Sequence, residues 1–198
     1  MFSIYSIYLR EPLKISNMKR LLLIALIALF GFQVQAQRFL TKNGIVSLYS
    51  KTPFETIEAL NNQVNCALDT KTSDLVFRVL MKSFEFKRAL MQEHFNENYV
   101  ESDKYPDAQF KGKVTNLKSI DFKKDGVYPA VVEGDLTMHG TSKHINTNGS
   151  FEIKDGKVNG KCRFAIKVDD YGIKVPSAVT DKIADSIQID VNVMLNAM

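Results

Sequence analysis

Hydrophobic and polar residues alternate one by one along much of the chain. The cleanest alternations cover residues 162–168 and 187–195, where every second residue is apolar. A period of two is typical of a β-strand that buries one face and exposes the other. Shorter runs rich in β-branched and aromatic residues occupy 45–50, 57–69 and 75–82, and polar or proline-containing breaks separate them. The pattern predicts a protein made mainly of antiparallel strands.

Two Asp-Gly dipeptides, Asp125-Gly126 and Asp155-Gly156, are expected to form tight turns between strands. This dipeptide suits a type I′ turn, which needs positive φ at both central residues and matches the twist of paired strands. Each dipeptide therefore predicts a β-hairpin. The expected hairpins join strand 110–122 to strand 127–138, and strand 151–154 to strand 157–168.

A helix is expected where the alternation stops, at residues 86–96. Leu90, Met91, His94 and Phe95 stand at positions i, i+1, i+4 and i+5, which form one stripe along a helix. A second short helix is expected at 178–185.

Counting the runs gives about eight strands and no repeated βαβ unit. The fold class is therefore all-β, as a closed antiparallel barrel or a sandwich, with one or two short helices. An eight-stranded barrel is just wide enough to be filled by side chains or to hold one slender ligand.

The N-terminal part has the order of a secretory signal peptide. The basic pair after Met18 precedes an apolar run at 21–32, and Val34 and Ala36 are small residues before an expected cut after Ala36. The run is roughly 12 residues, whereas a membrane-spanning helix needs about 20, so no transmembrane anchor is expected after cleavage. We therefore predict a signal peptide at 18–36 and a barrel domain at 37–198, exported to the periplasm or secreted.

Residues 1–17 precede this signal and leave the true start undecided between Met1 and Met18. They form either an upstream extension or a long n-region of the signal peptide, and in neither case are they expected to be part of the barrel domain.

The net charge of +4 comes from 26 Lys and Arg against 22 Asp and Glu. The predicted leader holds four basic residues and one acidic residue, so the exported part carries 22 basic against 21 acidic residues. No run of Lys or Arg long enough for a nucleic-acid patch is left in it. With 45% hydrophobic and 24% charged residues, the composition is that of a globular chain. Nucleic acid is therefore not an expected partner.

No catalytic or metal-binding motif is found in the sequence. Cys66 and Cys162 lie on apolar sides of their strands, and either a disulfide or two separately buried thiols fits an exported protein. A zinc site would need Cys-x-x-Cys or nearby His ligands, and neither is present. Gly-x-Ser-x-Gly, His-Glu-x-x-His and a phosphate-binding glycine loop are also absent from the sequence. No metal or other cofactor is expected.

Several stretches together resemble the YceI-like family. They include Leu-Met-x-x-His-Phe from Leu90, Lys-Tyr-Pro from Lys104, Leu-Thr-x-His-Gly from Leu136, and a segment at 170–176, so the resemblance spans roughly 43–195. It implies a lipocalin-like, eight-stranded antiparallel barrel in the periplasm with an elongated apolar cavity. Members of this family are associated with polyisoprenoid and other long amphiphilic lipids, isoprenoid quinones among them.

A polyisoprenoid tail can be bound only by large inward-facing apolar residues, because it offers no polar group. Plain core packing is the alternative for each such residue. We expect His94 either to meet a ligand head group or to bond the region of Tyr105, and His139 to serve a turn on the solvated face. The candidate cavity-lining, ligand-binding residues are Phe77, Val79, Met81, Phe86, Leu90, Met91, His94, Phe95, Met138, Phe164 and Ile166.

The expected function is to hold a long isoprenoid-type lipid or isoprenoid quinone for transport, storage or sequestration. A long-chain amphiphilic lipid is the expected partner, and both monomer and homodimer stay open. Two alternatives remain at this point: an enzyme acting on a prenyl lipid or a quinone head group, and a stress-related interaction module with a filled barrel.

Overall fold

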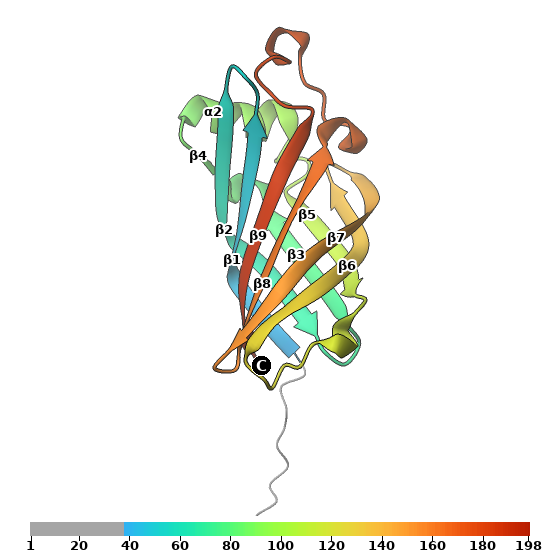
Figure 1. The fold of residues 1–198 in the computed structure, drawn as a ribbon. Coiled ribbons are helices and arrows are strands. Elements are labelled where there is room, and N and C mark those ends of the chain that lie inside the picture. Colours follow the sequence, from blue (N-terminus) through green and yellow to red (C-terminus); the bar gives the residue numbers. More distant parts are fainter. Residues whose placement is uncertain (1–37) are drawn as a thin grey trace, which may run out of the picture. The chain divides into compact units, whose positions relative to one another are not determined.

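Residues 38–198 are described by a computed structural model of the chain. The predicted signal peptide and the segment before it lie outside the described residues. Eight long antiparallel strands form a closed barrel in the order β1-β9-β8-β7-β6-β5-β3-β2, and β2 pairs back with β1 (Figure 1). The predicted eight-stranded barrel is confirmed. The strands are β1 (Arg38–Lys51), β2 (Thr56–Asp69), β3 (Asp74–Leu80), β5 (Asp107–Val114), β6 (Gly126–Met138), β7 (Thr141–Lys154), β8 (Lys157–Lys167) and β9 (Ser186–Ala197).

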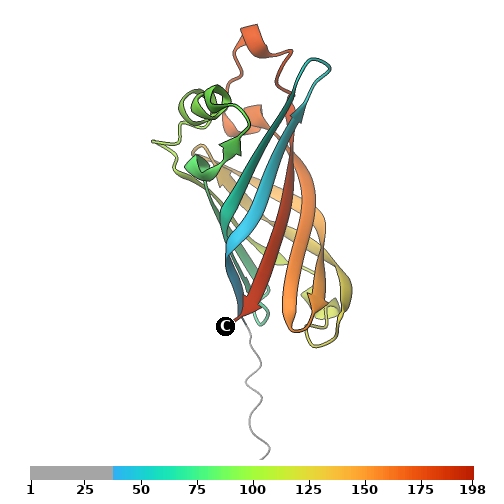
Figure 2. The same ribbon diagram turned by 90° about the vertical axis from the view of Figure 1, so that its left-hand side faces the viewer.

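The elements outside the barrel are short. β4 (Glu85–Phe86) pairs with β2, and it is followed by the helix α2 (Ala89–His94) and the π-helix η2 (Phe95–Tyr99). The 3-10 turns are η1 (Met81–Ser83), η3 (Leu117–Ser119), η4 (Val168–Tyr171) and η5 (Ser177–Val179). Figures 1 and 2 both show α2 and the segment 168–185 at one end of the barrel, opposite the β7–β8 turn. We call residues 168–185 the covering segment and this end the mouth.

The hairpin at Asp155-Gly156 is confirmed. Lys154 pairs with Lys157 across the turn, and Asp155 and Gly156 have φ of 50° and 72°, as a type I′ turn requires. A second tight turn of the same kind joins β6 to β7 at His139-Gly140.

The hairpin predicted at Asp125-Gly126 does not form, so that prediction is wrong. β5 ends at Val114, and residues 115–125 form a longer connection that returns to β6. Its apolar residues imitate the end of a strand, but Leu117 and Ile120 are buried in the core, and the Phe122 ring stacks on Phe39 with centroids 5.6 Å apart. These side chains pack the end of the barrel opposite the mouth.

The prediction of a second helix at 178–185 is also wrong. This stretch contains only the 3-10 turn η5 followed by irregular turns. The Ala184 amide donates to Ser50 Oγ at 2.8 Å, so this backbone group is bonded to the barrel. Val179 and Ile183 of this stretch line the cavity from this irregular backbone.

Candidate functional site

The barrel is solid at one end and hollow toward the mouth. The side chains of Leu68, Ile153, Val158 and Leu195 are almost completely buried and fill the closed end. Nearer the mouth the interior holds a cavity of about 350 Å³, lined by all eight barrel strands, by α2 and by the covering segment. This volume is within the range of small-molecule sites. The interior is therefore not filled by side chains throughout.

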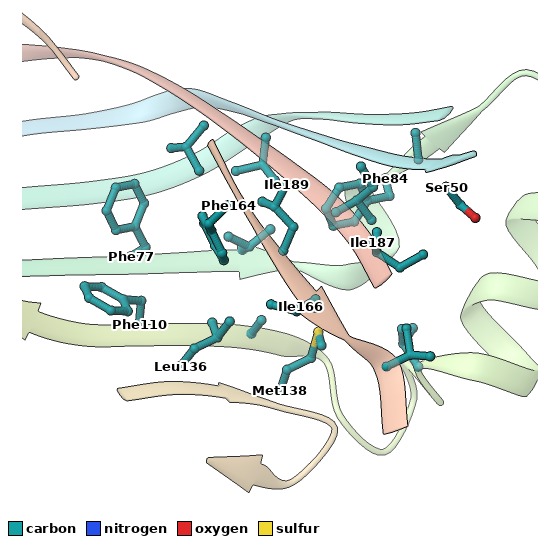
Figure 3. Close-up of a pocket in the computed structure, with 18 of the residues that line it drawn as sticks. Ser50, Phe77, Phe84, Phe110, Leu136, Met138, Phe164, Ile166, Ile187 and Ile189 are labelled. Atoms are coloured by element: carbon teal, nitrogen blue, oxygen red, sulfur yellow. The ribbon is translucent and has the colours of Figure 1, made fainter. Parts of the chain in front are cut away.

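The lining is almost entirely aliphatic and aromatic. Figure 3 shows Phe77 and Phe110 at one end of the lining, Ser50 at the other, and Phe164, Ile166 and Ile189 between them. The Phe77 and Phe110 rings meet edge to face with centroids 6.3 Å apart and belong to paired residues of β3 and β5. Such a lining can hold a ligand only by excluding water from apolar surface.

Ten of the eleven candidate residues from the sequence line this cavity. That they contact a ligand stays a prediction. The ten are Phe77, Val79, Met81, Phe86, Met91, His94, Phe95, Met138, Phe164 and Ile166.

Leu90 is the exception, because its side chain is 60% exposed and does not line the cavity. Consecutive positions on an α-helix point about 100° apart, so Leu90 and its neighbour Met91 need not share a face. In α2 the face that reaches the cavity carries Met91 and His94.

The sequence missed a larger set of lining residues. Alternation placed those on β9 on an apolar face, but nothing there distinguished a cavity wall from a packed core. Those in the covering segment carry no strand pattern, and their position follows only from the fold. The main ones are Leu48, Phe84, Phe110, Leu136, Ile145, Ile187, Ile189, Val191, Ile173, Val175, Val179 and Ile183.

A few polar side chains interrupt the lining at the mouth. The Glu55 carboxylate forms an ion pair with Arg88, which also contacts the sulfur of Met91 at 3.3 Å. Tyr99 also lines the cavity, and burial raises the pKa of its hydroxyl, which keeps the group protonated. His94 and Lys182 line the cavity with exposed side chains, so they lie at its opening.

His139 joins the two segments that lie over the mouth. Its Nδ1 is 3.0 Å from the Tyr171 carbonyl oxygen in the covering segment, and its Nε2 is 2.8 Å from Glu101 Oε2, just after the π-helix. Its ring also meets the Tyr105 ring, with centroids 4.6 Å apart. The turn position expected for His139 is correct, but its side chain is only 13% exposed and so does not lie on a solvated face. His139, and not His94, bonds in the Tyr105 region.

Both cysteines are free thiols in the structure. Cys66 is buried in the core, and burial raises the pKa of its thiol. Cys162 lines the cavity, where burial, together with the charge of Asp190, raises the pKa of its thiol from 9.0 to about 11. Cys162 is therefore a chemical reporter on the cavity wall.

Alkylation of Cys162 in a Cys66→Ala variant is expected to be slow at pH 8 and to accelerate with each pH step toward about 11. Because only the thiolate reacts, a rise of two pKa units lowers the rate about 100-fold relative to an exposed thiol. The rate of iodoacetamide labelling, followed by mass spectrometry across this pH range, checks it. A rate that levels off below pH 9 contradicts this account of the Cys162 environment.

Residues 38–198 lack the features of two other kinds of site. No helix in this range is long and apolar enough to cross a membrane. Within the same range, no three or more His, Cys, Asp or Glu side chains gather as metal ligands would.

The model of the YceI-like domain family matches residues 40–195, which is nearly all of the described barrel. The chain belongs to the YceI-like family. Among curated relatives, a UPF0312 protein of Pseudomonas putida strain F1 is 32% identical over 99 residues. That match covers 47% of this chain and 48% of the relative, so the chain spans about half the length of the curated relatives it matches.

Solved structures share the YceI-like fold at low sequence identity. A polyisoprenoid binding domain from Saccharophagus degradans, implicated in plant cell wall breakdown, superposes with a TM-score of 0.72 at 12% identity, covering 83% of this chain and 100% of that one. BcnA of Burkholderia cenocepacia gives 0.64 at 15% identity, covering 78% and 96%. A YceI protein of Campylobacter jejuni gives 0.54 at 19% identity, covering 71% and 84%. At these identities the likeness establishes the fold.

Proposed function

We propose that this YceI-like protein binds one long isoprenoid-type lipid, an isoprenoid quinone among the candidates, with the tail inside the barrel. The observation that carries the proposal is the apolar cavity of about 350 Å³, which opens at the mouth. The polyisoprenoid binding domain of Saccharophagus degradans, which has the same fold, supports this ligand class.

The energetics of the cavity suit a hydrocarbon tail. Each 100 Å² of tail surface removed from water contributes about 2.5 kcal/mol. Because the cavity wall is already formed, binding loses conformational entropy mainly in the ligand and little in the protein. Met81, Met91 and Met138 are flexible and polarisable, so they can adapt to the methyl branches of an isoprenoid chain.

The cavity favours a binding role over a barrel that acts only through its outer surface, because a solidly packed interior would be the more stable arrangement for such a module. A role in transport, storage or sequestration follows if the lipid enters and leaves through the mouth.

We also propose export to the periplasm by the signal at 18–36, which predicts that the mature protein begins at Gln37. The intact mass of the protein from the producing cell tests this start.

Uptake of prenyl lipids by the purified protein tests the binding proposal. Tails of increasing length are delivered from dilute detergent, and binding is followed by native mass spectrometry. We expect one lipid per barrel and an affinity that rises with tail length until the cavity is full. Affinity independent of tail length, or no uptake at all, would overturn the proposal.

A further inference from the structure

Three side chains at the mouth have no partner in the part of the chain that the structure describes. His94, Tyr99 and Lys182 all line the cavity, yet none of the three side chains has a hydrogen bond or ion pair to another residue within 38–198. Glu55, which also lines the cavity, has its carboxylate in an ion pair with Arg88. The mouth therefore presents a set of unused hydrogen-bond donors above an apolar cavity.

The backbone brings two of these donors to the same opening through an uncommon local structure. After His94 the α-helix widens into the π-helix Phe95–Tyr99, closed by the Val100 amide donating to the Phe95 carbonyl at 2.9 Å. This wider turn lets His94 and Tyr99, five positions apart, both line the cavity. Single π turns inside helices are rare and are often found at functional sites.

The third donor comes from the covering segment. Lys182 lies between η5 and β9, and its own amide donates to the Val179 carbonyl at 3.0 Å. The segment is held to the barrel on both sides of Lys182, by the Ala184 amide on Ser50 Oγ and by the contact of His139 with the Tyr171 carbonyl. Lys182 is thus carried by an anchored segment, and Figure 1 shows that segment at the same end of the barrel as α2.

We propose that His94, Tyr99 and Lys182 form a head-group subsite that receives a ligand group with acceptor oxygens, such as a quinone carbonyl or a phosphate. This inference rests on the proposed lipid-binding function and adds a chemical selectivity to it. The tail supplies affinity, and the three donors select against a tail that has no oxygen-bearing head. A tyrosine hydroxyl is protonated at physiological pH, and burial raises the pKa of Tyr99 further, so this hydroxyl can act as a donor.

Three probes with equal prenyl tails test the subsite: a prenyl quinone, a prenyl phosphate and the headless prenyl hydrocarbon. The variants are Tyr99→Phe, His94→Ala and Lys182→Gln, and Lys174→Gln and Tyr128→Phe are matched controls whose side chains do not line the cavity. Loss of one hydrogen bond to the head is expected to weaken the headed ligands about 5-fold and to leave the hydrocarbon unchanged. Neither control should change any of the three affinities.

The same titrations separate the two head-group sources. A Lys182→Gln loss that is larger for the phosphate and falls with added salt identifies an anionic head, and equal losses identify a carbonyl head. The subsite is overturned if the variants weaken the hydrocarbon as much as the headed ligands, or if they leave the headed ligands unaffected. If the unmodified protein takes up none of the three probes, the lipid-binding function itself fails.

Discussion

Val79→Trp is expected to weaken the binding of a long prenyl lipid by roughly 70-fold while leaving the barrel folded. Val79 lies on β3, pairs with Ala108 of β5, and lines the cavity with a half-buried side chain. An indole at this position enters space that the tail would occupy. If the indole displaces about 100 Å² of buried tail surface, the binding free energy of the lipid falls by about 2.5 kcal/mol.

A control on the same strand separates blocking of the cavity from disturbance of the fold. Val76 points outward from β3 and is 40% exposed, so Val76→Trp adds the same indole outside the barrel. We expect Val76→Trp to bind prenyl lipid like the unmodified protein. Isothermal titration or native mass spectrometry of both variants decides the matter. Equal binding by Val79→Trp and Val76→Trp would mean that the tail does not occupy this cavity.

Gly112→Ala is expected to lower the free energy of unfolding by about 3 kcal/mol, the largest stability effect we predict. Gly112 and Gly134 pair directly between β5 and β6, under the ring of Phe110. A Cβ on Gly112 would overlap the carbonyl oxygen of Glu133, and it would lie 2.5 Å from Phe110 Cζ and 2.8 Å from Gly134 Cα. Backbone cannot yield as a flexible side chain does, so either the strands separate or the Phe110 ring moves.

Gly156→Ala provides the comparison for this effect. Gly156 has φ of 72° in the β7–β8 turn, and a Cβ there would meet nothing within 4 Å. Gly156→Ala should therefore lower the free energy of unfolding by about 1 kcal/mol, because alanine disfavours the left-handed backbone conformation at this position. Urea unfolding of the two variants measures both values. If Gly112→Ala lowered the free energy of unfolding no more than Gly156→Ala, the backbones of β5 and β6 would not approach each other closely at Gly112.

The sequence predicted the barrel because alternation is a direct consequence of strand geometry. Phe164 and Ile166 share the parity of a clean alternation, and both face the interior. The same reasoning failed at residues 115–125, where apolar side chains pack the closed end from an irregular loop. A hydrophobic pattern reports that a side chain is buried, but it does not report which backbone conformation carries it there.

The cavity was predictable only in part for a related physical reason. A wall residue and a core residue look alike in a sequence, and the difference between them is whether the opposite wall is close enough to fill the space. Val179 and Ile183 show the limit, because their place in the lining depends on the covering segment crossing the mouth. Leu90 shows the opposite error, in which an apolar residue of a short helix faces solvent.

We propose above that the apolar cavity holds one lipid tail. Its most direct test is to purify the protein from the cells that make it, extract it with organic solvent, and identify and quantify the extracted lipid by mass spectrometry. We expect a lipid with an isoprenoid tail at close to one molecule per barrel, reduced to a trace in Val79→Trp and retained in Val76→Trp. A barrel that is consistently empty and also fails to take up any prenyl lipid would rule out lipid binding in this cavity, and so would equal lipid content in the two tryptophan variants.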